Sequence, residues 1–167
     1  MNNFQYLFRP ISLGKLTLTN RIMMPAVGTN FCTPKGEVTE RLIYFLQARA
    51  RGGAALLTTE GTYISMNGRE STNQLGIHRD DLIPGLKELA AAIHREGAKI
   101  FVQLIHAGRQ TLSIATGSDI VAPSPVPCKL MREMPRELSV KEIHELIEAY
   151  GEAARRAKEA NFDGIEI

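Results

Sequence analysis

One side chain in the stretch KIFVQLIHAGRQ, residues 99–110, could do chemistry that its apolar neighbours cannot. Gln103 interrupts a run that suits a strand buried on both faces, and a buried primary amide is costly unless it finds hydrogen-bond partners. A ligand edge that alternates an N–H with carbonyl oxygens would satisfy the amide, and the pyrimidine rim of a flavin has such an edge. Neighbouring backbone or water would also satisfy it, and the strand alone slightly favours this second interpretation.

His106 and Arg109 follow that strand directly. An imidazole one residue past a strand end can act as an acid or base, and a guanidinium can hold a carboxylate or a phosphate. A histidine in such a turn is more often a hydrogen-bonded structural residue, which is the role we expect for His106. For Arg109, a salt bridge that fastens the long following loop is as good an interpretation as ligand binding.

Two further segments bring small or polar residues to the ends of predicted strands. Pro25-Ala26-Val27-Gly28 combines a missing N–H with small side chains, which would let a flat ligand lie against the backbone, although a strand terminator explains it too. Thr58-Thr59-Glu60-Gly61 adds polar groups and leaves space at the glycine. We expect Glu60 to anchor a neighbouring loop, because an isolated carboxylate beside an anionic cofactor would be unfavourable.

Hydrophobic periodicity predicts the elements that would hold these residues. A hairpin is expected over residues 10–20, and Ser139 with Glu142 forms a capping box. A Pro- and Ser-rich connection occupies residues 107–138, and Gly97 suits a left-handed helix C-cap. The other predicted elements are strands over 21–27 (closed by Pro25), 54–61, 99–105 and 162–167, and helices over about 39–53, 80–97 and 139–160.

Strand and helix alternate three times before a final strand, which predicts an α/β fold with a parallel sheet and right-handed crossovers. The long insertions follow strands, whereas the turns from helix to strand are short. This asymmetry is typical of a (β/α)8 TIM barrel, whose site is built from the loops at the C-terminal ends of its strands. A doubly wound sheet would place its ligand there too, but no GxGxxG follows the first strand.

The length of the chain sets a limit on that barrel. A full barrel takes about 250 residues, and this chain has 167. We therefore expect residues 1–167 to be the N-terminal half of a barrel domain, with strands one to four and an N-terminal hairpin, truncated in the fourth strand. Open sheet edges and an uncovered apolar face would make such a half unstable or sticky by itself.

Composition narrows the class of protein and its partners. Hydrophobic residues make up 44% of the chain and charged residues 23%, as in soluble globular proteins. The formal net charge of +2 is too small to argue for nucleic acid or a membrane surface as a partner. Residues 1–10 lack the apolar core of a signal peptide. We expect a cytoplasmic protein with a small-molecule substrate, and homo-oligomerisation stays open.

Cysteine and histidine spacing predicts no metal site. Cys32 and Cys128 lie far apart in the sequence, and two free thiols in a reducing compartment are the simpler interpretation, although a disulfide stays open. Three more histidines are expected at the surface or on helix flanks: His78, His94 and His144.

Five segments together resemble the Old Yellow Enzyme family of flavin oxidoreductases. In chain order they are LFRPISLGKLTLTNRIMMPA, LLTTEGTYIS, FVQLIHAGRQ, APSPVP with the capped helix behind it, and FDGIEI. Each is weak alone, but five in the right order and spacing are a strong signal that covers essentially the whole chain. HAGRQ and APSPVPCKLMREMPREL are most similar to the branch that contains 2,4-dienoyl-CoA reductase and trimethylamine dehydrogenase.

The resemblance implies a barrel with FMN at its C-terminal mouth. The segment 25–28 would lie along the flavin, Gly61 would be the small residue near its ring, and Gln103 would bond its pyrimidine edge. NAD(P)H would give hydride to the flavin, which would pass it to the β-carbon of an activated alkene, as in ene-reductases. The family's substrate-binding histidine pair directly follows the fourth strand and is expected just beyond Ile167, so no catalytic residue is assigned within the chain.

Departures from the family pattern leave other interpretations open. Gly28 stands where many members carry Thr or Cys, so tuning of the flavin must come from elsewhere. The resemblance places the basic residues for the FMN phosphate outside this sequence, and also the 4Fe-4S cluster and FAD that are possible in this branch. We therefore expect the chain alone to be inactive and to retain FMN weakly or not at all. The alternatives are a non-catalytic half barrel that serves as a binding or assembly module, and a lyase or aldolase with a lysine Schiff base. The latter is disfavoured because no lysine ends a predicted strand.

Overall fold

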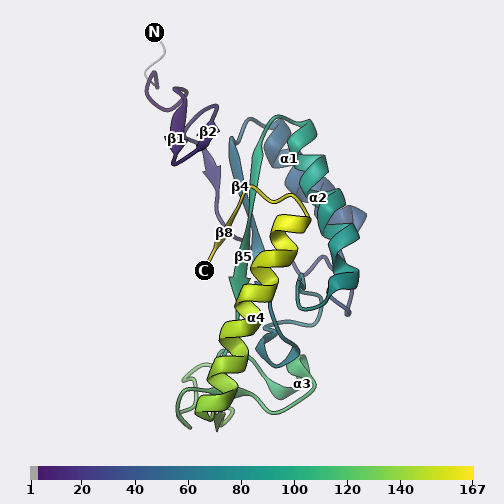
Figure 1. Cartoon of the computed structure of the whole chain (residues 1–167), viewed down its shortest axis with the longest axis vertical. Helices are drawn as coiled ribbons and strands as arrows, with labels where there is room; N and C mark the ends of the chain where they lie inside the picture. Colours follow the sequence, from purple (N-terminus) through teal and green to yellow (C-terminus); the bar gives the residue numbers. More distant parts are fainter. Residues whose placement is uncertain (1–3) are drawn as a thin grey trace.

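A four-stranded parallel sheet forms the centre of the molecule in the computed structural model, which describes residues 4–167 (Figure 1). The strands lie side by side in the order in which they occur in the chain, each one pairing with the next in parallel. That order is expected when every connection crosses over in the same direction, as in one half of a β/α barrel. The strands are β3 (Met23–Met24), β4 (Leu56–Tyr63), β5 (Lys99–Ile105) and β8 (Gly164–Glu166).

Three long helices pack against this sheet: α1 (Glu40–Arg51), α2 (Ile83–Arg95) and α4 (Val140–Glu159). The Thr39 side chain accepts a hydrogen bond from the Leu42 N–H and so caps the start of α1. At α4 the predicted capping box is confirmed: Ser139 Oγ accepts from the Glu142 N–H, and the Glu142 carboxylate accepts from the Ser139 N–H. Both starts are therefore set by local sequence.

The N-terminal hairpin is confirmed, with β1 (Ile11–Leu13) antiparallel to β2 (Leu16–Leu18). The strand predicted over 21–27 with Pro25 closing it is present but shorter than expected, because only β3 pairs with β4 and residues 25–28 leave the sheet. A proline has no N–H to give to a ladder, which accounts for the end of pairing at Pro25. This early end leaves the segment 25–28 free to border a pocket.

The helix predicted over 80–97 begins later than expected, since the short 3₁₀ turn η2 (Asp80–Leu82) precedes α2. Gly97 closes that helix with a φ of +78°, as predicted. The two other short elements are η1 (Met66–Gly68) and α3 (Ser113–Thr116). The long connection over 107–138 also forms a small parallel pair, β6 (Val121–Ala122) with β7 (Arg136–Glu137).

The two inner strands differ in burial. All of β4 except Gly61 is buried, as predicted for a strand covered on both faces. In β5, by contrast, burial alternates: Val102 and Leu104 face the helices in the main core, while Gln103 and Ile105 are only half-buried. The expectation of burial on both faces is therefore wrong for β5. Its less buried face is the one that carries Gln103.

The outer face of α4 carries exposed apolar side chains, among them Val140, Ile143 and Ile147.

None of the helices within residues 4–167 combines the length and apolarity needed to cross a membrane. Residues 1–3, part of the N-terminal segment predicted to lack a signal peptide, lie outside the described residues.

Candidate functional site

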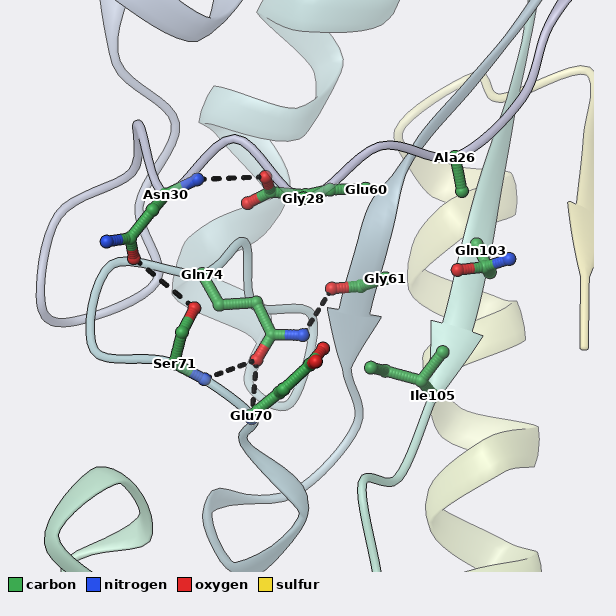
Figure 2. A pocket seen from close by; sticks show the side chains of 10 residues that line it. All are labelled: Ala26, Gly28, Asn30, Glu60, Gly61, Glu70, Ser71, Gln74, Gln103 and Ile105. Atoms are coloured by element: carbon green, nitrogen blue, oxygen red, sulfur yellow. Dashed lines mark hydrogen bonds between the residues drawn. The ribbon is translucent and has the colours of Figure 1, made fainter. Parts of the chain in front are cut away.

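A pocket of about 370 Å³ opens at the C-terminal ends of the sheet strands (Figure 2). Four of the predicted site residues line it, from three different segments of the chain. The other two predicted site residues, Pro25 and Val27, belong to the segment 25–28 but do not line the pocket. Its lining residues are Ala26, Gly28, Asn30, Glu60, Gly61, Glu70, Ser71, Gln74, Gln103 and Ile105.

Gly61 lies at an irregularity of β4, where the register with β5 shifts between Thr58 and Gly61. A Cβ at Gly61 would come within 2.7 Å of Ile105 Cδ1 and 3.4 Å of Gln103 Oε1, so a larger residue would press into the pocket wall. The Gln103 N–H donates to Thr59 Oγ1 at 3.3 Å. The bulge thus brings a glycine, an amide and an apolar side chain to one rim.

The Gln103 side chain finds a partner that the sequence reasoning did not name. Its Nε2 donates to Glu166 Oε1 at 2.6 Å, and these two residues are direct register partners on β5 and β8. Figure 2 shows the amide oxygen turned to the Gly61 side and the nitrogen turned away. One half of the amide is therefore satisfied inside the protein, and the other half faces the pocket. Glu166 belongs to the predicted final strand FDGIEI, but its contact with Gln103 depends on the strand register.

Glu60 anchors two loops, as predicted. The carboxylate is 2% exposed and accepts from Thr29 Oγ1 at 2.6 Å, from the Asn30 N–H at 3.3 Å and from the Leu75 N–H at 2.9 Å. Cys32 Sγ lies 3.8 Å from Glu60 Oε1, and burial, with the nearby Glu60 charge, raises the pKa of that thiol. Cys32 is therefore a neutral, buried thiol, and Cys128 is also free, so the two form no disulfide.

A polar loop that the sequence analysis did not single out completes the pocket. Gln74 Nε2 donates to the Gly61 carbonyl, and Gln74 Oε1 accepts from the Glu70 N–H at 2.7 Å. Asn30, whose φ is +56°, accepts through Oδ1 from the Asn73 N–H at 2.9 Å. Asn tolerates this backbone conformation better than most residues, which was a weak signal in the sequence.

His106 and Arg109 lie outside the pocket lining. His106 Nδ1 accepts from the Gly108 N–H at 3.1 Å, and burial lowers the pKa of the imidazole. The geometry therefore agrees with the structural role expected for His106. Arg109 donates to the Val126 carbonyl at 3.1 Å, so it fastens the following loop through a carbonyl and not through a salt bridge.

Two of the three remaining histidines are not simple surface residues. His144 is exposed as predicted. His78 stacks on the buried Tyr63 with ring centroids 4.8 Å apart, and burial lowers its pKa to about 4. His94 Nε2 lies 2.7 Å from Asp163 Oδ2, at the N-terminal end of the sheet. Both pairings join residues far apart in the sequence, which spacing alone does not reveal.

The remaining chemistry of the site is limited by its residue types. Across residues 4–167, no three His, Cys, Asp or Glu side chains gather closely enough to hold a metal ion. The pocket lining contains no lysine, which weighs against a Schiff base there. What remains is a set of amide and carboxylate groups beside small residues, suited to a flat polar ligand.

Comparison with known proteins connects this geometry to a family. The model of the NADH:flavin oxidoreductase / NADH oxidase family matches residues 6–167. The chain is 46% identical over 169 residues to NADH oxidase from Thermoanaerobacter brockii, which covers 100% of this chain and 26% of that protein.

Solved structures agree with this match. The Old Yellow Enzyme homologue from Zymomonas mobilis superposes with a TM-score of 0.85 at 33% identity, over 95% of this chain and 47% of that one. The structure of 2-naphthoyl-CoA reductase gives a TM-score of 0.91 at 33% identity, over 96% of this chain and 26% of that one. The chain thus spans between a quarter and a half of the length of these proteins.

Proposed function

The chain belongs to the NADH:flavin oxidoreductase / NADH oxidase family, and we propose that it supplies the FMN-binding N-terminal half of a barrel enzyme that reduces activated alkenes with NAD(P)H. Its parallel strands and helices form the first part of an Old Yellow Enzyme-type (β/α)8 barrel. The proposed domain is residues 1–167, and the proposed cofactor-binding residues are Pro25, Ala26, Val27, Gly28, Gly61 and Gln103.

The pocket is the observation that carries this proposal. Ala26 and Gly28 border it with small side chains, and a Cβ at Gly28 would meet nothing within 4 Å, so there is open space beside this backbone. On the opposite rim, Gly61 has no side chain to fill the pocket, and the amide oxygen of Gln103 points toward the pocket. Small walls and a hydrogen-bonding amide fit the ring and pyrimidine edge of FMN.

Each residue of the pocket would have a defined task. Gln103 would orient the pyrimidine edge, and Glu60 would hold the loop that contains Thr29 and Asn30 against the end of the strand. Ile105 would exclude water from one side. When bound, FMN supplies the acceptance and release of hydride, a chemistry for which protein side chains have no equivalent.

The substrate class is the least constrained part of the proposal. Two similar structures, 33% and 31% identical to this chain, are a 2-naphthoyl-CoA reductase and a morphinone reductase. Both names denote the reduction of an unsaturated ring system, which supports an unsaturated carbonyl or enoyl compound as the substrate. The residues that polarise such a carbonyl are proposed to follow β8.

The test is flavin binding by the full-length protein that contains this sequence. We expect a yellow protein with a flavin absorbance band, and loss of that band in Gln103→Leu and in Gly61→Val. Gln110→Leu is the matched control, because Gln110 is exposed and lies outside the pocket lining. A colourless protein that fails to take up added FMN would contradict the proposal.

A further inference from the structure

We infer that Glu166 is a positioning residue that fixes which end of the Gln103 amide faces the pocket, so that the pocket selects a ligand edge with an N–H donor. This inference rests on the function proposed above, in which the ligand is FMN. It assigns a role to Glu166, whose side chain is only half-buried and does not line the pocket.

The two side chains meet because of the strand register. Gln103 on β5 and Glu166 on β8 are parallel partners, so both project from the same face of the sheet. Gln103 Nε2 lies 2.6 Å from Glu166 Oε1, the length of a strong hydrogen bond to a carboxylate. The pair is therefore a cross-strand contact built into the sheet.

The chemistry of the pair determines its direction. A carboxylate can only accept hydrogen bonds, and in a primary amide only the nitrogen can donate them. Glu166 therefore holds the nitrogen of Gln103, and the oxygen points the opposite way. The oxygen is the nearer end to Gly61, where an added Cβ would lie 3.4 Å from Gln103 Oε1, and Figure 2 shows it on the pocket side.

The neighbouring strand supports both residues. Thr58 Oγ1 donates to Glu166 Oε2 at 3.4 Å, and the Thr58 side chain is fully buried on β4. Thr59 Oγ1 accepts from the Gln103 N–H at 3.3 Å. Residues of three adjacent strands, β4, β5 and β8, thus fix both the backbone and the side-chain nitrogen of Gln103.

A consequence for ligand recognition follows. The inward oxygen accepts a hydrogen bond, so it favours a ligand with an N–H at that position, such as N3–H of the flavin pyrimidine ring. A neutral amide at position 166 could offer either an oxygen or a nitrogen to Gln103. In Glu166→Gln the Gln103 side chain is therefore free to turn over, and the preference for an N–H is lost.

The first measurement reads the amide orientation without any ligand. In the ¹⁵N-labelled full-length protein, the side-chain amide signals of Gln103 are assigned by their absence in Gln103→Leu. We expect one amide proton shifted downfield by the carboxylate, and the loss of that shift in Glu166→Gln. Asp163→Asn, which removes a carboxylate three residues away, is the control and should leave the signal in place. An unshifted signal in the wild-type protein, or one unchanged by Glu166→Gln, would overturn the inference.

The second measurement compares FMN with 3-methyl-FMN, in which a methyl group replaces N3–H. The wild-type protein should bind FMN more tightly by about tenfold, the factor expected for one lost hydrogen bond at a buried site. In Glu166→Gln that ratio should fall toward about threefold or less, since the amide can turn. A ratio that stays at the wild-type value in the variant would also overturn the inference.

The two measurements separate this inference from the proposed function. A shifted Gln103 signal in a protein that binds no FMN would contradict the proposed function while supporting the role of Glu166. Glu166→Asp serves if Glu166→Gln does not fold, because its shorter side chain withdraws the carboxylate and predicts the same loss of the shift. Circular dichroism checks that each variant is folded before its signals are compared.

Discussion

The two ends of the parallel sheet use hydrogen-bonded carboxylates for different purposes. At the N-terminal end, Asp163 accepts from the Ile100 N–H at 2.9 Å and pairs with His94 and Lys99 at 2.7 and 3.0 Å. At the C-terminal end, Glu60 accepts from loop residues that border the pocket, among them Asn30. The first carboxylate joins strand to helix, and the second holds loops in place.

This difference reflects what each end must do. Burial alone would raise the pKa of Asp163, but the Ile100 N–H, His94 and Lys99 more than offset it and leave the pKa below its usual value. None of the side chains of Asp163, His94 and Lys99 lines the pocket at the C-terminal end. In β/α barrels the N-terminal face serves stability and the C-terminal face serves binding. Changes at the two ends should therefore affect stability and flavin binding to different degrees.

The largest effect is expected from Glu60→Gln. The substitution replaces an acceptor oxygen with an amide nitrogen and leaves buried donors such as the Leu75 N–H without a partner. We expect the free energy of unfolding to fall by about 3 kcal/mol, with loss of FMN retention, because each hydrogen bond to a charged group contributes about 1.5–3 kcal/mol and a buried donor left without a partner is costly. Urea denaturation and the flavin absorbance of the full-length protein measure the two effects.

Glu145→Gln is the control for this change. Glu145 is exposed and its ion pair with Lys141 is 3.7 Å long, so the control should change unfolding by less than about 0.5 kcal/mol. Retention of FMN by a stable Glu60→Gln protein would show that the two loops do not need this carboxylate to keep the pocket open.

Asp163→Asn should separate the two ends most clearly. It removes the charge shared by His94 and Lys99 while leaving the pocket lining intact. We expect the free energy of unfolding to fall by about 2 kcal/mol, as for a partly buried, hydrogen-bonded carboxylate. The dissociation constant for FMN, measured by fluorescence quenching below the unfolding transition, should not change. Weaker FMN binding by a fully folded Asp163→Asn protein would contradict the separate roles of the two ends of the sheet.

Acidification should affect the C-terminal end first. His78 stacks on Tyr63 at the end of β4, and its pKa in the folded protein is about 4 against 6.5 in the unfolded chain. As the pH falls below 6.5 the unfolded chain binds a proton that the folded protein does not, so stability is lost progressively down to about pH 4. We expect a loss of about 1–2 kcal/mol over that range.

The lowered pKa of Asp163 places its own loss of stability at a lower pH. That carboxyl stabilises the fold above the ordinary aspartate pKa, and its contribution disappears as the pH falls through the lowered value. His78→Phe keeps an aromatic ring against Tyr63 and should flatten the profile between pH 6.5 and 4. An unchanged profile in urea melts of this variant would exclude His78 as the titrating group.

Local features of the fold could be predicted from the sequence. The capping box at Ser139, the C-cap at Gly97 and the bounds of β5 depend on neighbouring residues, and each is confirmed. The strand predicted over 21–27 is shorter than expected, because only Met23 and Met24 pair with β4 before Pro25 ends the ladder. The half-exposed face of β5 was also missed, because it depends on what packs on the sheet from elsewhere.

The site was predictable only in part, for a similar reason. Gln103, Gly61 and Gly28 could be singled out as residue types at strand ends, and the pocket brings them together. The partner of Gln103 could not, since Glu166 lies 63 residues away and meets it only through the strand register. His94 and Asp163, 69 residues apart, were missed in the same way. Their binding roles remain predictions.

The smallest effect is expected from Glu142→Gln, which tests whether position alone makes a carboxylate part of the site. Glu142 lies in the first turn of α4, after the connection that follows β5. Hydrogen bonds from Arg136 and from the backbone and hydroxyl of Ser139 lower its pKa to about 2. Because this cap is solvent-exposed and touches no pocket residue, we expect a melting temperature lowered by less than half the Asp163→Asn shift, with no change in FMN binding. If Glu142→Gln weakened FMN binding as much as Glu60→Gln, the cap of α4 would contribute to FMN binding as much as the anchoring of the pocket loops by Glu60.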